Sequence, residues 1–462
     1  MLDTLLLPFK PRLDGHTELR AQRSTVHAAA ILNGNVVNNG SSDVQGLSAR
    51  AYSGGLWGLA SASDCDEKSV KTVLEAAERN AKFLSSRLGE KAPPFTAQTQ
   101  TIKRSVAEGG DTEQQLVLDF VRGLEAYIAQ KYPNLISRYV SGSAYTSERV
   151  LVTSDGSDLV LYTPGTTLGA QLSVLADDGT AIEYYDNLIP ALDGKTPFAE
   201  IVADVDAIHA RIDAVYEKLM QKRDGTFARA GEFDVILDSN LAGILAHEAI
   251  GHTTEADLVL GGSIAGPNLG KTVASEMVTL VDFAHTYNGG AVPERIFVDD
   301  EGTVAQDVTI IENGVLKNFM HNRETARKFE HEPLGNARAN AFSDEPLVRM
   351  RNTAILPGTD KFEDMIASVA DGYYLSQPTN GQADLTSEFM FGVSIGYEIK
   401  DGKLGRAIRD TTISGVAFDL LKTITMLSDE MTWLGGTCGK KQSIATGMGG
   451  PAVKCRVTIG GR

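Results

Sequence analysis

Two histidines and a glutamate lie close enough in this sequence to form a catalytic metal site. The segment "AGILAHEAIGH", residues 242–252, places Glu248 directly after His247 and a second histidine, His252, five residues after the first. In the common zinc-protease helix the second histidine follows after four residues. Imidazole nitrogens are good zinc ligands, and a neighbouring carboxylate can serve as a general base. The residue types therefore suggest metal-assisted hydrolysis.

The five-residue spacing would require an irregular helix. A regular α-helix turns about 100° per residue, so a step of five residues overshoots the shared face by about 140°. A bulge with i→i+5 hydrogen bonding would realign the two side chains, and such bulges are frequent at functional sites. Gly251, directly before His252, accepts unusual backbone angles. A metal site here thus predicts a locally widened helix.

Under this hypothesis each residue has a distinct role. His247 and His252 bind zinc, and Glu248 takes a proton from the attacking water and passes it to the leaving amine. A third protein ligand is also needed. Glu255 and Asp257 lie just downstream, and each could be that ligand or could orient a ligating imidazole. The alternative is a helix that carries two histidines on a hydrated face and binds no metal.

The neighbouring sequence favours the metal site over that alternative. The helix is otherwise apolar and small ("NLAGILA"), so buried histidines and a buried glutamate would need partners. The preceding "FDVILD" is typical of a buried strand, which predicts a buried strand-to-helix unit. Ser239 or Asn240 is expected to cap the start of the helix.

The surrounding sequence resembles a known family. The segment "GEFDVILDSNLAGILAHEAIGHTTEAD", with "GNARAN", "RMRNT" and "GGTCGKKQSIATGMGGPAVK" further on, is similar to the TldD/PmbA (modulator of DNA gyrase) metallopeptidases. The HExxxH motif marks the TldD-like catalytic type. The resemblance is strong over the C-terminal half and weaker over the N-terminal half. The chain departs from the family pattern at "TTEAD" and "GMGGP", which bears on substrate choice and leaves the metal-site residues intact.

The resemblance implies the third zinc ligand. In catalytic members a cysteine at the "GTCGK" position completes a site of two histidines and one cysteine, and here that residue is Cys438. A thiolate is an excellent zinc ligand, and the glycines around it allow close backbone approach. Judged alone, Cys438 could also be a small buried hydrophobic residue, which is the role expected for Cys65 and Cys455.

The resemblance also implies a function and a partner. It predicts a peptidase with one zinc ion per chain that cleaves peptides or unfolded segments inside a dimer cavity, holding them as an added β-strand. The partner would be a second copy or a related TldE/PmbA-like subunit. Two alternatives are a zinc amidohydrolase acting on a small biosynthetic amide and a non-catalytic peptide-binding subunit of a hetero-oligomer. The intact motif and Cys438 count against the second.

An amide hydrolase also needs a group that stabilises the developing oxyanion. Arg338, in "GNARAN", is the preferred candidate for this substrate-binding role because the motif around it matches the family. His285, Tyr287 and His321 are weaker candidates, since each is more simply explained as an ordinary structural residue.

The elements that position these residues indicate an α+β fold. Amphipathic helices are expected at 67–88, 112–131 and 197–222, and strands over much of 1–62 and 135–187. We predict an N-terminal mixed α/β domain, residues 1–228, that forms the dimer and its cavity. A strand-rich C-terminal metallopeptidase domain, residues 229–462, would carry the HExxxH helix. The polar segment "QKRDGTFARAGEF" marks the expected boundary.

Composition narrows the range of partners. The 462 residues include 43 basic and 60 acidic side chains, which gives a net charge of −17 and no general attraction for nucleic acid or anionic lipid. The three cysteines contain no CxxC pair and do not suggest a disulfide framework. The sequence has neither a signal peptide pattern nor a run of about 20 apolar residues. We therefore expect a cytoplasmic protein without nucleic-acid or membrane partners.

Overall fold

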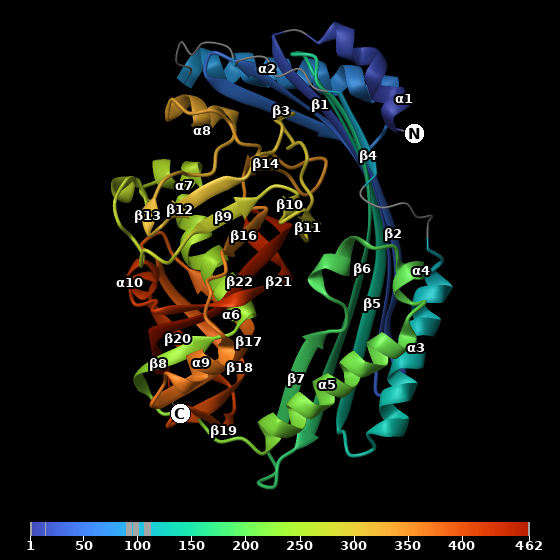
Figure 1. Cartoon of the computed structure of the whole chain (residues 1–462). Helices are drawn as coiled ribbons and strands as arrows, with labels where there is room; N and C mark the ends of the chain where they lie inside the picture. The colour runs from blue at the N-terminus through green and yellow to red at the C-terminus, as the bar shows by residue number, and fades with distance from the viewer. Residues whose placement is uncertain (1, 14, 89–94, 96–100, 106–111, 461–462) are drawn as a thin grey trace.

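The computed structural model describes residues 2–13, 15–88, 95, 101–105 and 112–460. Long strands of the N-terminal region curve from the top of Figure 1 down its right side, and the C-terminal region lies on the left, within that curve. Helices and strands are both abundant, and the C-terminal region is rich in strands. The predicted α+β fold class is confirmed.

The N-terminal elements, in chain order, are α1 (Leu2–Leu6), η1 (Leu7–Arg12), β1 (His16–Leu32), β2 (Asn35–Ser53), β3 (Leu56–Ala62), α2 (Glu67–Leu88), β4 (Thr101–Ser105), α3 (Gln114–Lys131), β5 (Ser137–Thr153), β6 (Asp158–Leu175), β7 (Ala181–Asn187), η2 (Ala191–Lys195), α4 (Phe198–Ile201) and α5 (Val205–Arg223).

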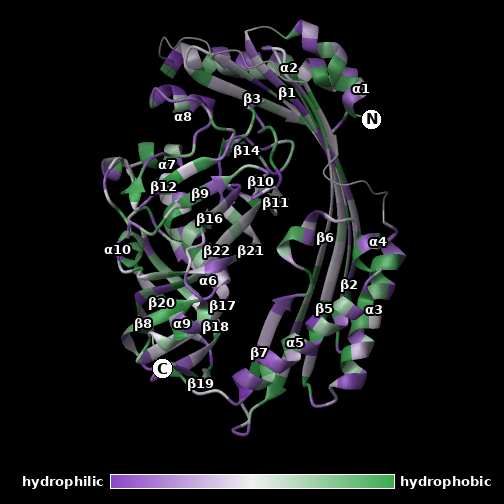
Figure 2. Cartoon of the chain, in the orientation of Figure 1, coloured by the Kyte–Doolittle hydropathy of each residue, from purple (hydrophilic) through white to green (hydrophobic). Residues whose placement is uncertain are grey.

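These N-terminal strands form one sheet. In the described part of the chain it has seven strands in the order β3-β2-β1-β5-β6-β4, with β7 beside β6. Its pairs are antiparallel except β4 with β6. Figure 2 shows hydrophobic and hydrophilic residues alternating along α3 and α5, as expected for helices that place one face on a sheet.

Two of the three predicted N-terminal helices are confirmed, and the third is interrupted. Helix α2 has the predicted bounds and buries Val70, Val73 and Ala77, and α3 lies within the predicted segment. The prediction of a single helix at 197–222 was wrong, because the chain forms two helices there, α4 and α5. The side chain of Asp204 accepts a hydrogen bond from the backbone N–H of Ala207 and so caps a new helix start.

The C-terminal elements, in chain order, are β8 (Gly231–Leu237), α6 (Ser239–Ile244), η3 (Leu245–Gly251), η4 (His252–Thr254), α7 (Ala256–Leu260), η5 (Gly266–Asn268), β9 (Leu280–Phe283), β10 (Thr286–Tyr287), β11 (Gly290–Ala291), β12 (Val308–Glu312), β13 (Val315–Leu316), α8 (Arg323–Lys328), β14 (Ala337–Arg338), β15 (Leu347–Val348), β16 (Asn352–Ile355), α9 (Phe362–Ala367), β17 (Asp371–Ala383), β18 (Glu388–Lys400), β19 (Lys403–Ile408), β20 (Thr411–Val416), α10 (Ala417–Lys422), β21 (Met426–Lys440) and β22 (Gln442–Gly460).

The second large sheet supports the helix that carries the two histidines. Its main path, within the described residues, runs β13-β12-β9-β16-β22-β20-β18-β17-β8. Helix α6 packs directly on β22, since a Cβ added at Gly243 would lie 3.0 Å from the backbone of Met448, and one at Gly450 would lie 3.0 Å from Ala242. These glycines permit a close helix–sheet approach, which fixes the height of the helix above the sheet.

The helix start differs from the sequence expectation. Asp238 is the cap: its side chain accepts a hydrogen bond from the backbone N–H of Leu241, while Ser239 and Asn240 lie inside the first turn. The same carboxylate also accepts from the hydroxyl of Ser376, so the cap is tied to β17. The cap therefore joins the helix to its sheet as well as satisfying its first N–H groups.

The fold also bears on the expected absence of membrane-spanning helices and on the expected domain boundary. Among the described residues, no helix has the length and apolar character that crossing a membrane would require. The boundary predicted near residue 228 falls between α5 and β8. The division into two domains at that point stays a prediction.

Candidate metal centre

The helix that carries the histidines is widened at the predicted place. Residues Leu245–Gly251 form a π-helix, η3, and the backbone N–H of His252 donates to the carbonyl oxygen of His247. This is the i→i+5 hydrogen bond that a five-residue spacing needs if both side chains are to lie on one face. A Cβ added at Gly251 would lie 2.0 Å from the Sδ of Met350, so the bulge also depends on a missing side chain.

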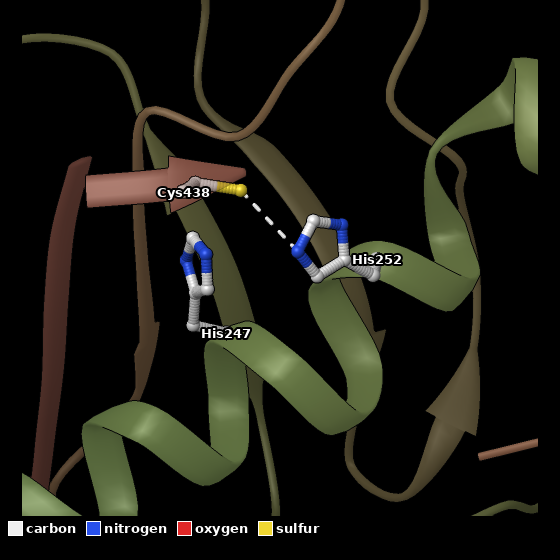
Figure 3. Close-up of side chains that lie close together, drawn as sticks. All are labelled: His247, His252 and Cys438. Atoms are coloured by element: carbon white, nitrogen blue, oxygen red, sulfur yellow. Dashed lines mark hydrogen bonds between the residues drawn. The ribbon is translucent and has the colours of Figure 1, made fainter. Parts of the chain in front are cut away.

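The two imidazoles meet a thiol from a distant strand. One donor atom from each of His247, His252 and Cys438 lies within 4.8 Å of the others, and this is the one such group of three among the described residues. Figure 3 shows both rings rising from the helix towards the sulfur of Cys438 at the end of β21. The Sγ atom lies 3.2 Å from Nε2 of His252. The structure thus brings the three sequence-predicted ligands together.

Glu248 lies beside this group without belonging to it. Its Oε2 is 3.7 Å from Nε2 of His252, and its side chain keeps 23% of its surface exposed. Burial raises the pKa of the Glu248 carboxyl, an effect that the charge of Glu255 reinforces and that of His252 opposes. A partly exposed carboxyl with a raised pKa is suited to exchange protons with a bound substrate.

The two downstream carboxylates lie in different places. Oε2 of Glu255 is 3.0 Å from Nδ1 of His252, so Glu255 holds the ring nitrogen that faces away from Cys438. Glu255 is fully buried. Asp257 instead accepts a hydrogen bond of 2.7 Å from Lys440. Only Glu255 is therefore placed to orient a histidine.

The electrostatic surroundings of the two histidines differ. Burial, helped by the charges of His252, Arg349 and Arg338, holds the pKa of His247 well below its usual value, which keeps the ring neutral. Burial also opposes the charged form of His252, but hydrogen bonds with Cys438 and Glu255 outweigh it and raise its pKa to about 10.

The other candidates lie outside this group. Arg338 is 6% exposed and donates to the carbonyl oxygen of Met350, and its Nη2 lies 3.6 Å from Glu294. His285 packs on Phe297. Tyr287 contacts Phe283 and Trp433, and His321 stacks with His331. The positive charge of Arg338 helps to lower the pKa of His247. Its guanidinium donates a hydrogen bond to the backbone of Met350.

Sequence reasoning missed two residues at this site. Thr353 places its Oγ1 3.5 Å from Nδ1 of His247. Arg349 is fully buried and donates to the carbonyl oxygen of Cys438 at 2.6 Å. Both lie in "RMRNT", residues 349–353, one of the segments that carry the family resemblance, and that resemblance is the one sequence signal that pointed to this segment.

A cavity of about 780 Å³ is lined in part by Thr437, the residue before Cys438, and the three residues of the group are not among its lining residues. Its walls come from both regions of the chain: N-terminal residues around β6, β7 and η2, and C-terminal residues of β21 and β22. The contributing residues of β21 run without a break from Met431 to Thr437, which directly precedes Cys438. Within the described strands, β21 pairs only with β22. Among the described residues, its other edge forms a bridge with Asp360 at Ser428 and carries no strand from Met431 to Thr437.

The sequence matches models of one protein family in two places. Residues 230–461 match the PmbA/TldA metallopeptidase C-terminal domain, and residues 17–81 match PmbA/TldA metallopeptidase domain 1. The first match covers half of the chain and includes all three residues of the group.

Similar proteins support the same grouping. A protein of Methanothermobacter thermautotrophicus named "Metalloprotease" is 30% identical over all of this chain and 98% of its own length. A "Zinc metalloprotease TldD homolog" of Saccharolobus solfataricus is 32% identical over 56% of this chain and 58% of its own. The fold also matches the crystal structure of TldE from Thermococcus kodakarensis, with a TM-score of 0.75 and 17% identity over 98% of this chain and all of that one. Sequence and fold agree with the expected resemblance, and the chain belongs to the TldD/PmbA family of metallopeptidases.

Proposed function

We propose that this chain is a zinc peptidase of the TldD type in which His247, His252 and Cys438 hold one zinc ion. The observation that carries the proposal is the convergence of two imidazoles and one thiol within 4.8 Å. Donors that share an ion tetrahedrally at about 2.0–2.3 Å are about 3.3–3.7 Å apart, so the donor atoms would have to approach one another by at most about 1.5 Å. Two nitrogens and a sulfur suit zinc better than calcium or magnesium, which prefer oxygen.

Three protein ligands leave one position open, as in catalytic zinc sites. Zinc bound there would act as a Lewis acid that polarises a carbonyl group and makes water acidic enough to ionise near neutral pH. Glu248, beside the group and partly exposed, takes the proton from the attacking water and delivers it to the leaving amine. Glu255 keeps Nδ1 of His252 engaged, so that Nε2 faces Cys438.

The proposed substrate is an extended peptide or an unfolded segment. The free edge of β21 borders the cavity from Met431 to Thr437 and would pair with a substrate strand through main-chain hydrogen bonds. Such pairing carries the substrate towards Cys438 and tolerates many side chains. Peptides with N-methyl groups at alternate residues should be cleaved poorly, whereas changed side chains should matter less. Equal loss from both changes would count against strand addition.

A small amide is the second candidate substrate. The cavity volume of about 780 Å³ lies within the usual range for small-molecule sites, about 300–1,000 Å³. The deciding assay compares release of new amino termini from an unfolded protein with hydrolysis of small amides by the same preparation. Cleavage restricted to small amides would favour an amidohydrolase. Peptide binding without cleavage of either substrate would favour a non-catalytic subunit.

The proposed assembly is a dimer that encloses the substrate. One protein that this chain resembles in fold is named TldE, and the partner would be such a related subunit or a second copy. Native mass spectrometry of the purified chain, alone and with a TldE-like protein, separates the two. A chain that remains monomeric and is fully active under both conditions would contradict the dimer proposal.

The assignment of Glu248 is tested by its replacement. In Glu248→Ala the zinc content should remain near one ion per chain, because no ligand is lost, and peptide cleavage should fall by about 10²–10⁴-fold. Glu217→Ala, an exposed carboxylate on α5, is the matched control and should retain activity. Retained cleavage in Glu248→Ala would refute the general-base role.

A further inference from the structure

The hairpin that carries Cys438 is paired up to its turn, with Cys438 opposite Ile444 and Lys440 opposite Gln442. Cys438 is followed by Gly439, where an added Cβ would meet no atom within 4 Å, and by Lys440. Lys441 then turns the chain with a positive φ of 57° before β22 begins. The tip of this hairpin therefore has open space beside Gly439 and a residue with left-handed backbone angles in its turn. The strand pairing sets the register of Cys438, and contacts from outside the hairpin add to it by holding the tip in place.

One buried arginine makes those contacts. The side chain of Arg349 is fully buried. Its Nη2 donates to the carbonyl oxygen of Cys438 at 2.6 Å, and its Nη1 donates to that of Gln442 at 3.0 Å. One planar guanidinium thus holds both sides of the hairpin turn. Lysine could not reproduce this, because its single ammonium lacks the rigid fork.

The same arginine faces the carboxylate that orients His252. Nε of Arg349 lies 4.0 Å from Oε1 of Glu255, an oxygen that has no hydrogen bond of its own. The other oxygen of Glu255 lies 3.0 Å from Nδ1 of His252. Because Nε2 of His252 lies 3.2 Å from Sγ of Cys438, the contacts close a ring from the cysteine backbone back to its sulfur.

The negative charge of buried Glu255 is balanced by positively charged side chains around it. A fully buried carboxylate such as Glu255 requires cationic partners. Arg349 supplies one, and Lys440 supplies another at 3.3 Å from Oε2, while also holding Asp257 at 2.7 Å. Lys440 is itself part of the hairpin that carries Cys438. Arg349 and Lys440 therefore each link Glu255 to the hairpin that presents the thiol.

We propose that Arg349 is a positioning residue that sets the distance between the Cys438 thiolate and His252. Its guanidinium does not touch substrate, because it is fully buried and donates to backbone carbonyls. It acts through the cysteine backbone on one side and through Glu255 on the other. The inference rests on the proposed zinc site and deepens it, because it names what pre-organises the ligand that lies farthest away in the sequence.

The test uses cobalt(II) as a spectroscopic substitute for zinc in the full-length chain. Cobalt bound by a thiolate gives a near-ultraviolet charge-transfer band that reports the sulfur ligand without an activity assay. In Arg349→Lys, the cobalt dissociation constant should rise about 10–100-fold, and the band per bound cobalt should weaken. Cys438→Ser defines complete loss of the band.

The matched control is Arg20→Lys. Arg20 is also a buried arginine that donates to backbone carbonyls, those of Ala341, Phe342 and Asp344. The variant Arg20→Lys should lower thermal stability without changing the cobalt charge-transfer band or the affinity for cobalt. If Arg349→Lys keeps both the wild-type band and the wild-type affinity, the positioning role is overturned. A wild-type protein that binds cobalt with no sulfur band would instead overturn the zinc site itself.

A second variant covers the case in which Arg349→Lys fails to fold. The double variant Arg349→Met/Glu255→Gln removes both charges of the buried pair, a change that proteins tolerate better than the loss of one partner. Compared with Glu255→Gln alone, it should show the weaker band, because only the double variant lacks the donors to the hairpin carbonyls. Equal bands in the two variants would contradict the proposal.

Discussion

At the scale of single residues, the candidate centre is organised around the imidazole of His252. Its Nε2 faces the thiol of Cys438, and its Nδ1 faces the carboxylate of Glu255. Oε2 of Glu248 lies 3.7 Å from the same Nε2. The sequence alone was sufficient to nominate the two histidines and the glutamate as candidates, because they lie within six residues of the chain. Cys438 is 186 residues from His252 and was identified only through the family resemblance. Arg349 was missed, since no local pattern reveals which carbonyls a distant arginine will reach.

A histidine outside the centre gives a prediction about pH. His321 is 2% exposed and lies beside His331, and burial lowers its pKa from 6.5 to about 4. The unfolded chain therefore binds a proton near pH 6.5 that the folded chain binds only near pH 4, so this histidine lowers the free energy of unfolding as pH falls through that window. In His321→Gln the urea midpoint should change less between pH 7 and pH 5 than in wild type. An equal or larger change would contradict the assignment.

At the scale of elements, the π-helical turn is the feature that makes a five-residue histidine spacing workable. It was expected from the sequence on one condition, that both histidines bind the same metal ion, because a regular helix would place them on different faces. The helix cap was not predicted correctly: Asp238 competes with Ser239 and Asn240 for that role, and its bond to Ser376 on β17 decides the outcome. Local propensity alone cannot include such a tertiary contact.

Replacement of Gly251 tests whether the turn depends on a missing side chain. In Gly251→Ala the new Cβ would lie 2.0 Å from Sδ of Met350, and the resulting shift should lower the free energy of unfolding by about 1–3 kcal/mol and reduce zinc content. Gly123→Ala is the control within helix α3, where an added Cβ meets nothing within 4 Å. It should stabilise by about 0.5–1 kcal/mol with zinc unchanged. Urea unfolding and metal analysis would disagree with this account if both variants behaved alike.

At the scale of the whole molecule, the cavity depends on how the two regions of the chain are joined, because both supply its walls. Lys195 of the N-terminal region contacts Glu294 of the C-terminal region at 2.8 Å, and both line the cavity. Farther up, Arg50 on β2 pairs with Glu18 on β1 at 3.0 Å and with Glu301 across the junction. The fold class followed from the sequence patterns. These pairings join residues up to 251 positions apart, and sequence patterns do not encode them.

The junction ion pair should contribute strongly to stability. In Arg50→Met, Glu18 and Glu301 lose their shared buried cation, and the free energy of unfolding should fall by about 3–5 kcal/mol. Arg23→Met removes a pair with Asp43 in which both side chains are about half exposed, and it should cost less than about 1 kcal/mol. Chemical unfolding of the two variants measures the contrast. Similar losses would mean that the junction does not depend on this buried pair.

The most direct test of the central claim is X-ray absorption at the zinc K-edge of the purified protein. The account predicts about one zinc ion per chain with one sulfur neighbour near 2.3 Å and two imidazole nitrogens near 2.0–2.1 Å. The sulfur neighbour should disappear in Cys438→Ser. A zinc shell that contains no sulfur in the wild-type protein, or the same sulfur signal in Cys438→Ser, would contradict a centre built from His247, His252 and Cys438.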